Sequence, residues 1–136
     1  LDLIRGSHLI LGRPCPQAYL LEVPGERRII FVLPWKGKTL VGTTEVRQTL
    51  GSPIRCGDDE RDYMLRVFRH YFPEISLDGV EIEDFAGLRP LIRSAADPSQ
   101  VTREYALHRE GNLISVFGGK WTTSHALARK LSSQIQ

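Results

Sequence analysis

Short runs of β-forming residues, broken by prolines and glycines at close intervals, are the feature that most constrains the fold of this chain. The runs cover residues 9–11, 18–23, 29–33 and 39–43. The segments between them carry the turn-forming sequences Pro14-Cys15-Pro16, Pro24-Gly25 and Trp35-Lys36-Gly37. Proline and glycine at these intervals set turns that reverse the chain. The spacing therefore predicts an antiparallel meander.

A helix of about residues 58–72 is predicted after the fourth run, because Asp58 or Asp59 offers an N-cap and Pro73 ends the pattern. Its apolar residues recur at i, i+3, i+4 and i+7, which places them on one face that packs on the sheet: Met64, Val67, Phe68 and Tyr71. Residues 46–57, before the helix, show little periodicity.

Three more strands are predicted at residues 80–91, 101–107 and 113–117, with Gly111-Asn112 as the turn between the last two. From Thr122 the apolar residues fall at i+4 intervals, as in an amphipathic helix: Leu127, Leu131 and Ile135. This order indicates an α+β fold, in which an antiparallel sheet has helices packed on one face, including a C-terminal helix.

Composition narrows the classes of function. The chain has 136 residues, of which 41% are hydrophobic and 25% charged, as in one globular unit. Its 18 basic and 16 acidic residues are mixed along the sequence, which argues against nucleic-acid binding. Cys15 and Cys56 lack the spacing of a metal or redox pair, so no metal site is expected. No apolar run reaches the roughly 20 residues that a transmembrane helix needs.

The segment from Phe117 to Thr123 reads FGGKWTT and joins a predicted strand to a predicted helix. Gly118 and Gly119 let a ligand approach the backbone, and a helix start favours anionic or electron-rich atoms. Lys120 adds a positive charge where the helix dipole disfavours it, unless an anion compensates. The alternative, a tight turn with a solvated lysine, carries equal weight from this motif alone.

Two arginines form a second candidate site. Arg89 lies between Leu88 and Pro90, and the proline restricts the local backbone. Arg103 lies on the following predicted strand. An arginine fork suits a carboxylate or phosphate, so the pair could clamp one phosphate. The alternative is that each arginine pairs with an acidic residue, such as Glu81, Glu83 or Asp84.

A third candidate is His8, which enters an apolar strand in the sequence Arg5-Gly6-Ser7-His8. Its imidazole could exchange a proton near neutral pH, although a hydrogen-bonded structural histidine is the commoner case. Gly42-Thr43-Thr44-Glu45 closes another strand with two hydroxyls and an acid. This second segment reads equally as the rim of a ligand site or as ordinary strand-edge chemistry.

Five motifs occur in order over nearly the whole chain: Arg5 to His8, Gly42 to Glu45, Gly87 to Leu91, Val101 to Tyr105, and Ser115 to Thr123. Together they resemble the flavoprotein glycerol-3-phosphate dehydrogenases and the related α-glycerophosphate oxidases. Glu45 stands where that family usually has aspartate.

The resemblance implies oxidation of sn-glycerol 3-phosphate to dihydroxyacetone phosphate, with FAD as the hydride acceptor. It places Arg89, Arg103 and Lys120 at the substrate, with the phosphate among the contacts of the arginines. It also implies that His8, as proton acceptor or hydrogen-bond partner, and Lys120 act at the reacting centre. The residues that would border the flavin are Gly118, Gly119, Lys120 and Thr122.

The resemblance further implies a fragment of a two-domain FAD oxidoreductase fold. Residues 1–112 would form a substrate-binding region, and residues 113–136 a strand and helix that return to the FAD-binding domain. The G-x-G-x-x-G fingerprint of the N-terminal FAD-binding part does not occur in these residues. This piece is therefore expected neither to retain FAD nor to be active alone.

Two other classes of function stay open. One is the substrate domain of a flavoenzyme that oxidises amino acids or 2-hydroxy acids, and the other is a noncatalytic binding domain. For the dehydrogenase, the resemblance leaves the electron acceptor as quinone or oxygen. It is compatible with a cytoplasmic protein, peripheral association with the cytoplasmic membrane, and a homodimer.

Overall fold

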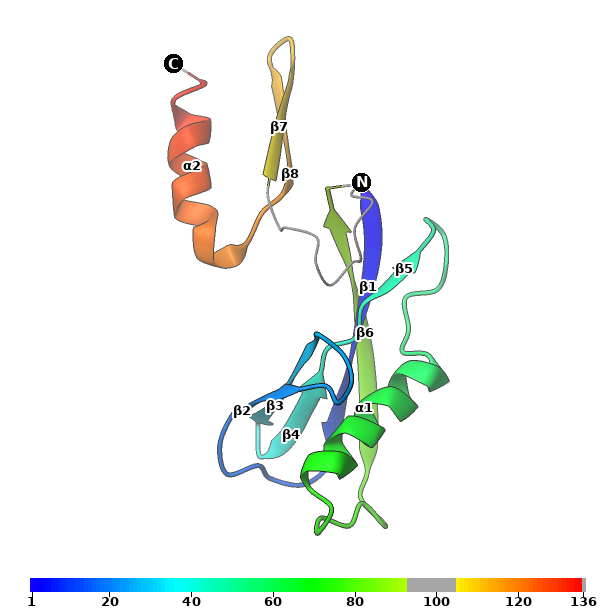
Figure 1. Ribbon diagram of the computed structural model, residues 1–136. Helices are drawn as coiled ribbons and strands as arrows, with labels where there is room; N and C mark the ends of the chain where they lie inside the picture. Colours follow the sequence, from blue (N-terminus) through cyan, green and yellow to red (C-terminus); the bar gives the residue numbers. More distant parts are fainter. Residues whose placement is uncertain (93–104, 136) are drawn as a thin grey trace.

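The computed structural model describes residues 1–92 and 105–135. These residues form an antiparallel six-stranded sheet, a separate two-stranded hairpin and two α-helices, which confirms the predicted α+β class (Figure 1). In chain order the elements are β1 (Asp2–Leu11), β2 (Tyr19–Glu22), β3 (Ile29–Trp35), β4 (Lys38–Gly42), β5 (Val46–Gln48), α1 (Asp58–Tyr71), β6 (Ile82–Leu91), β7 (Tyr105–Glu110), β8 (Leu113–Gly118), the 3₁₀ turn η1 (Trp121–Thr123) and α2 (Ser124–Ser132).

The strand β1 lies inside the larger sheet. It pairs with β6 over its full length, from Asp2 opposite Leu91 to Leu11 opposite Ile82. On its other edge it pairs first with β5 and then with β4. The predicted meander therefore holds for β2, β3 and β4, whereas β1 is inserted between β4 and β6. Its ten residues are long enough to pair with two short strands along one edge.

Sequence patterns missed β5, which consists of only three residues in the segment predicted to lack periodic structure. Its strand conformation comes from pairing with β1, in which Val46 lies opposite Arg5 and Gln48 opposite Leu3. A strand of this length is too short to show an alternating pattern, and tertiary pairing decides its conformation.

The helix α1 covers one face of the large sheet. Met64, Val67 and Phe68 are buried in the core, as predicted. The prediction for Tyr71 was wrong: its ring is exposed, and its hydroxyl donates to the carbonyl of Glu22 at 2.5 Å. Tyr71 is the last residue of the helix, where a hydroxyl that reaches the end of β2 keeps the ring at the surface.

The N-cap of α1 is Gly57, so the prediction of Asp58 or Asp59 was wrong by one or two residues. The carboxylate of Glu60, three residues into the helix, accepts the backbone N–H of Gly57 at 3.0 Å. This is the reciprocal half of a capping box, which needs no side chain at the N-cap itself. Asp58 and Asp59 lie in the first turn, where negative charge is also favourable.

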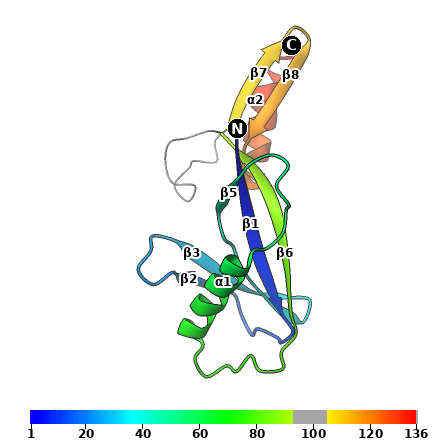
Figure 2. The ribbon, with the colours of Figure 1, turned by 90° about the vertical axis from the view of Figure 1, so that its right-hand side faces the viewer.

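The β7–β8 hairpin and α2 lie beyond the end of β1 and β6 that carries the N-terminus (Figures 1 and 2). The helix runs beside the hairpin: Arg109 donates to the carbonyl of Gln134 at 3.1 Å, and the Lys130 ammonium lies 5.3 Å from the Tyr105 ring centre. The helix was predicted to begin at Thr122, but α2 begins two residues later, at Ser124, because Thr122 belongs to η1. No helix in the described part is long and apolar enough to span a bilayer.

Strand alternation gives the large sheet two different faces. Leu9, Leu11, Ile30 and Val41 point to the α1 side and form the core. The opposite face is not covered by α1 (Figure 2), and strand register brings these residues together there: Gly6 and His8 of β1, Phe31 and Leu33 of β3, Leu40 and Gly42 of β4, and Phe85, Gly87 and Arg89 of β6.

Candidate functional site

Glycines on three neighbouring strands leave part of the open sheet face without side chains. Gly6 lies opposite Gly87, and Gly42 lies opposite His8. A Cβ at Gly6 would overlap the Arg89 guanidinium, and one at Gly42 would overlap the His8 imidazole. At Gly87, a Cβ would meet no atom of the described residues within 4 Å. The bare backbone therefore seats two functional side chains and leaves space beside them.

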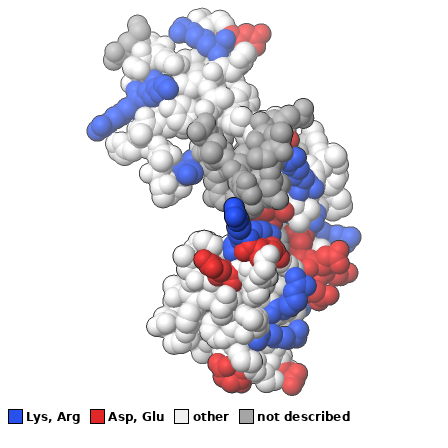
Figure 3. All heavy atoms as spheres, viewed as in Figure 1, with Lys and Arg blue, Asp and Glu red and all other residues white. Residues whose placement is uncertain are grey.

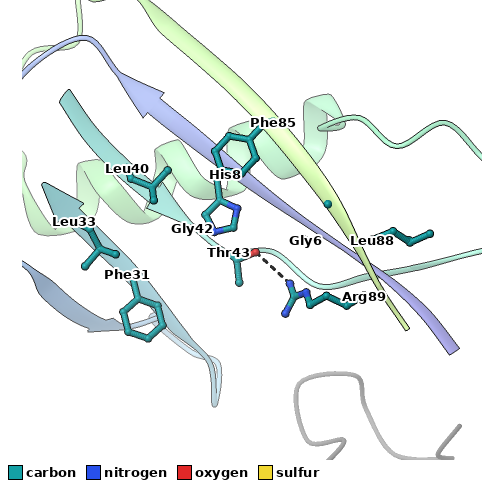
Figure 4. Close-up of a pocket in the computed structure, with 11 residues that line it drawn as sticks. Gly6, His8, Phe31, Leu33, Leu40, Gly42, Thr43, Phe85, Leu88 and Arg89 are labelled. Carbon is teal, nitrogen blue, oxygen red and sulfur yellow. Dashed lines mark hydrogen bonds between the residues drawn. The ribbon is translucent and has the colours of Figure 1, made fainter. Parts of the chain in front are cut away.

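A cavity of about 440 Å³ lies over this backbone (Figure 4). Its wall is mostly apolar, with Phe31, Leu33, Leu40 and Phe85 among its residues. The polar side chains that line it are His8, Thr43 and Arg89. A concave, mainly apolar site with a few convergent polar groups has the character of a small-molecule site.

His8 is placed by a ring stack and by its strand partner. Its ring lies parallel to that of Phe85, with the centroids 4.9 Å apart and 6° between the planes. Burial, and then the positive charge of Arg89, lower the pKa of His8 below 6.5. The imidazole is therefore neutral at neutral pH and able to accept a proton. Its buried Nδ1 has no hydrogen-bond partner among the described residues.

Arg89 is held by the segment that connects β4 to β5. Its guanidinium donates to Glu45 Oε1 at 3.3 Å, Thr43 Oγ1 at 3.3 Å and the Thr44 carbonyl at 3.1 Å. Arg28 approaches the other oxygen of Glu45 at 4.0 Å. The carboxylate thus lies between two guanidinium groups, and Arg89 is fixed at the cavity from several directions.

Arg89 pairs with Glu45, and not with any of the three acidic residues that the sequence offered as its partners. Glu81 and Glu83 both contact Lys38, and Asp84 contacts Arg61 at 2.9 Å. These pairs lie at the exposed end of the sheet, whereas Glu45 reaches Arg89 from another strand connection. Figure 3 shows basic and acidic side chains intermixed on one face of the molecule, with little charge over β2–β4.

The glycine-lysine segment lines a second cavity, of about 490 Å³. Gly118 and Gly119 have φ angles of +76° and +99°, which favour glycine, and they redirect the chain from β8 into η1. Lys120 and Thr122, both exposed, line this cavity together with Arg89. Arg89 therefore borders both cavities: one contains His8, and the other contains the predicted flavin-contacting residues.

Arg103, the second predicted arginine, lies outside the described residues. The two-arginine clamp therefore stays a prediction. The structure does bring Arg89 together with His8 on one side and with Lys120 on the other.

Thr43, Thr44 and Phe85 matter more to the site than the sequence indicated. The motif Gly42 to Glu45 was read equally as a ligand rim or as edge chemistry, and the structure makes it the support of Arg89. Phe85 was seen only as part of a strand. The signal that could have found it is alternation, because Phe85 and Arg89 are four residues apart on one strand face.

Sequence reasoning missed Glu60 altogether. Its carboxylate is buried under the sheet and accepts hydrogen bonds from Thr44, Gly57, Ser7 and Arg5. Burial would raise the pKa of Glu60, but these hydrogen bonds together hold it below its ordinary value. The available signal was a glutamate in the first turn of the predicted helix, three residues after Gly57.

Comparisons with known proteins agree on one family. Residues 1–134 match the family described as DAO, FAD dependent oxidoreductase. The chain is 37% identical over 144 residues to a glycerol-3-phosphate dehydrogenase of Pseudomonas tolaasii, covering 98% of this chain and 28% of that protein. It is 34% identical over 137 residues to a D-erythritol 1-phosphate dehydrogenase of Brucella abortus, covering 94% of this chain and 27% of that protein.

Among solved structures, the chain resembles the glycerol-3-phosphate dehydrogenase from Bacillus halodurans complexed with FAD. The TM-score is 0.76 and the sequence identity 33%, over 98% of this chain and 26% of that one. This chain thus spans about a quarter of the length of the relatives that it matches.

Proposed function

This chain belongs to the family of FAD dependent oxidoreductases, and from that premise we propose that it supplies the substrate-binding part of a glycerol-3-phosphate dehydrogenase. The reaction is oxidation of sn-glycerol 3-phosphate to dihydroxyacetone phosphate. The observation that carries the proposal is the position of Arg89, which borders the His8 cavity and also the cavity lined by Gly118 to Thr122. A phosphorylated substrate needs an anion ligand close to both a proton acceptor and a redox cofactor.

The residues at the site fit a flavin. The open face combines an apolar wall with bare backbone at Gly87, which suits a flat ring. Gly118, Gly119, Lys120 and Thr122 would hold its polar edge, because backbone amides and a cation stabilise negative charge there. When bound, FAD supplies the acceptor for the hydride that leaves C2 of the substrate.

Within this proposal each polar side chain has a separate role. Arg89, with Arg103 as its partner, binds the phosphate through charge-assisted hydrogen bonds. His8 takes the proton of the C2 hydroxyl, for which its lowered pKa keeps the imidazole neutral. Lys120, which lines the second cavity, would contact the substrate and the edge of the flavin. Phe31 and Phe85 give the cavity an apolar wall.

The organisation of the whole enzyme is also a proposal. Residues 1–112 form the substrate-binding region, and residues 113–136 lead back toward the FAD-binding part. Electrons then pass to quinone or oxygen. A cytoplasmic enzyme, peripheral on the membrane and assembled as a homodimer, is compatible with this scheme.

A second candidate substrate is D-erythritol 1-phosphate, favoured by the 34% identity to the Brucella abortus dehydrogenase that carries its name. Both compounds are phosphorylated polyols, so Arg89 would take the same part in either case. Steady-state kinetics of the full-length protein with the two compounds, compared by kcat/KM, separate these candidates. If the substrate is a carboxylate, as in amino-acid or 2-hydroxy-acid oxidases, the protein would instead oxidise compounds that carry no phosphate group.

The test of the proposal is Arg89→Gln in the full-length protein. We expect KM for glycerol 3-phosphate to rise roughly 10- to 100-fold, because a hydrogen bond to a charged group contributes roughly 1.5–3 kcal/mol. The much weaker reaction with unphosphorylated glycerol should change little. Arg69→Gln, an exposed arginine on the outer side of α1, is the matched control.

Equal losses with glycerol and glycerol 3-phosphate would refute phosphate binding by Arg89. A full-length wild-type protein without any dehydrogenase activity, measured with an artificial electron acceptor, would favour the noncatalytic alternative.

A further inference from the structure

The carboxylate of Glu60 lies on the α1 side of the sheet, opposite the cavity, and is only 6% exposed. It accepts five hydrogen bonds within the described part of the chain: from Arg5 Nε at 3.1 Å, Arg5 Nη2 at 2.6 Å, Ser7 Oγ at 2.8 Å, Thr44 Oγ1 at 2.5 Å and the Gly57 N–H at 3.0 Å. A carboxylate offers about four lone-pair sites, so this one is fully used.

Thr44 connects Glu60 to the backbone of β1. Its hydroxyl donates to Glu60 and also accepts the backbone N–H of Ser7 at 2.9 Å, while its own backbone N–H donates to the Ser7 carbonyl at 3.3 Å. The side chain of Thr44 is 3% exposed. The segment between β4 and β5 is thereby tied to β1 by its backbone and to α1 by its side chain.

The residues on either side of Thr44 contact Arg89. Thr43 lines the cavity and Glu45 reaches Arg89, whereas the Thr44 hydroxyl contacts Glu60 of α1. Arg89 donates to the Thr43 hydroxyl, to the Thr44 carbonyl and to the Glu45 carboxylate. Figure 4 shows Thr43 and Arg89 meeting at the cavity. A shift of Thr44 would therefore displace three acceptors of Arg89 together.

We propose that Glu60 and Thr44 are positioning residues, which act through the segment from Gly42 to Glu45 to hold Arg89 at the anion-binding position. Neither side chain touches the cavity, so neither is a catalytic residue. This inference rests on the proposed role of Arg89 as an anion ligand. It makes the position of Arg89 depend on Glu60, which lies in the first turn of α1 on the other side of the sheet.

The chain provides a matched control in Thr39, which lies on β4 close to the start of the same segment. Its side chain is 2% exposed, and its hydroxyl donates to the Arg13 carbonyl at 2.8 Å. Thr39→Val and Thr44→Val each replace one buried, hydrogen-bonded hydroxyl by a methyl group. Thr44→Val should cost more stability, because the Thr44 hydroxyl makes two hydrogen bonds and one of them is to a carboxylate. Both variants remove a buried hydroxyl, but only Thr44 is linked to Arg89, so the comparison is made on binding by the folded proteins.

The experiment measures binding of dihydroxyacetone phosphate to the full-length protein by calorimetry, so that no turnover is needed. We expect Thr44→Val to raise Kd about tenfold, because small displacements of a positioned group weaken binding strongly. Thr39→Val should leave Kd within about twofold of wild type, and Thr44→Ser, which keeps the hydroxyl, should restore wild-type binding. Equal effects of Thr44→Val and Thr39→Val would overturn the inference.

Arg89→Gln separates this inference from the proposed function. If Thr44 acts through Arg89, Thr44→Val should have little further effect on Kd in an Arg89→Gln background, since the two residues then form one coupled unit. Full additivity would overturn the positioning role. An unchanged Kd in Arg89→Gln alone would instead overturn the proposed role of Arg89 itself.

Glu60→Gln provides the same comparison if Thr44→Val does not fold. Glutamine has nearly the volume of glutamate, and its amide oxygen can still accept from Thr44, but it loses the charge that holds Arg5. We expect an intermediate rise in Kd, about threefold to tenfold. Binding equal to that of wild type, in a folded Glu60→Gln protein, would contradict the inference.

Discussion

The imidazole of His8 shows how a single side chain acquires a functional environment. It lies between Gly42, whose missing Cβ makes room for it, and Phe85, whose ring it stacks on. Burial removes water that would stabilise the charged form, and Arg89 adds a like charge nearby. Both effects act in the same direction, so the ring stays neutral to lower pH than an exposed histidine.

Titration of His8 by NMR in this chain is expected to give a pKa below 6.5. Arg89→Gln should raise that pKa toward 6.5, because it removes the repulsion between the imidazolium and the guanidinium, while the contribution of burial remains. Arg69→Gln, the charge-matched substitution on the outer side of α1, should leave the titration curve unchanged. A His8 pKa that is insensitive to Arg89, or above 6.5 in the wild type, would contradict this assignment.

At the level of single residues, the sequence predicted His8, Arg89, Lys120 and the glycines 118 and 119 because their chemistry is unusual for their positions. It did not find Glu60, since an acidic residue in the first helical turn is ordinary. Nor did it predict that Glu45 pairs with Arg89: the two are 44 positions apart, and only the strand register brings them together.

The helix α1 has two functions that lie at different places along its length. Its middle provides Met64, Val67 and Phe68 to the core, and its first turn provides Glu60 to the network behind the cavity. Periodicity predicted the first function well, because burial of an apolar face follows the helical repeat. The second depends on contacts with β1 and with residue 44, which no local pattern encodes.

Met64→Ala should lower the free energy of unfolding by about 2–5 kcal/mol, since Met64 is fully buried and alanine would leave a cavity. Urea denaturation of this chain, followed by circular dichroism, measures the change. Asp62→Ala, at an exposed position of the same helix, should change stability by less than about 0.5 kcal/mol. Similar midpoints for Met64→Ala and wild type would mean that α1 does not pack on the sheet as described.

At the scale of the whole molecule, the sheet has one face covered by its own helix and one face that is apolar and open. Phe31 and Phe85 are each 46% exposed on that open face. Exposed apolar side chains gathered on one face mark a contact surface. The Bacillus halodurans relative is complexed with FAD, and a flavin at this face is part of the proposed function.

The fold class followed from the sequence because turns and alternation are local signals. The central place of β1 did not follow, because its pairing with both β4 and β6 joins segments distant in the chain. The resemblance of five short motifs to a flavoprotein family provided what local physics could not: the expectation that His8, Arg89 and Gly118 to Thr122 belong to one site.

The last prediction concerns how much of the cofactor site this chain contains. Gly118, Lys120 and Thr122 are exposed and border one side of an open cavity, so the chain alone should contact only one edge of a flavin. After incubation with FAD and desalting, we expect this chain to remain colourless, whereas the full-length protein should retain roughly one flavin per chain. Visible absorption spectra of the two samples measure this directly. A chain of these 136 residues that kept a stoichiometric flavin band would show that the described face holds the cofactor by itself, and the proposed division between a substrate-binding and an FAD-binding part would then be wrong.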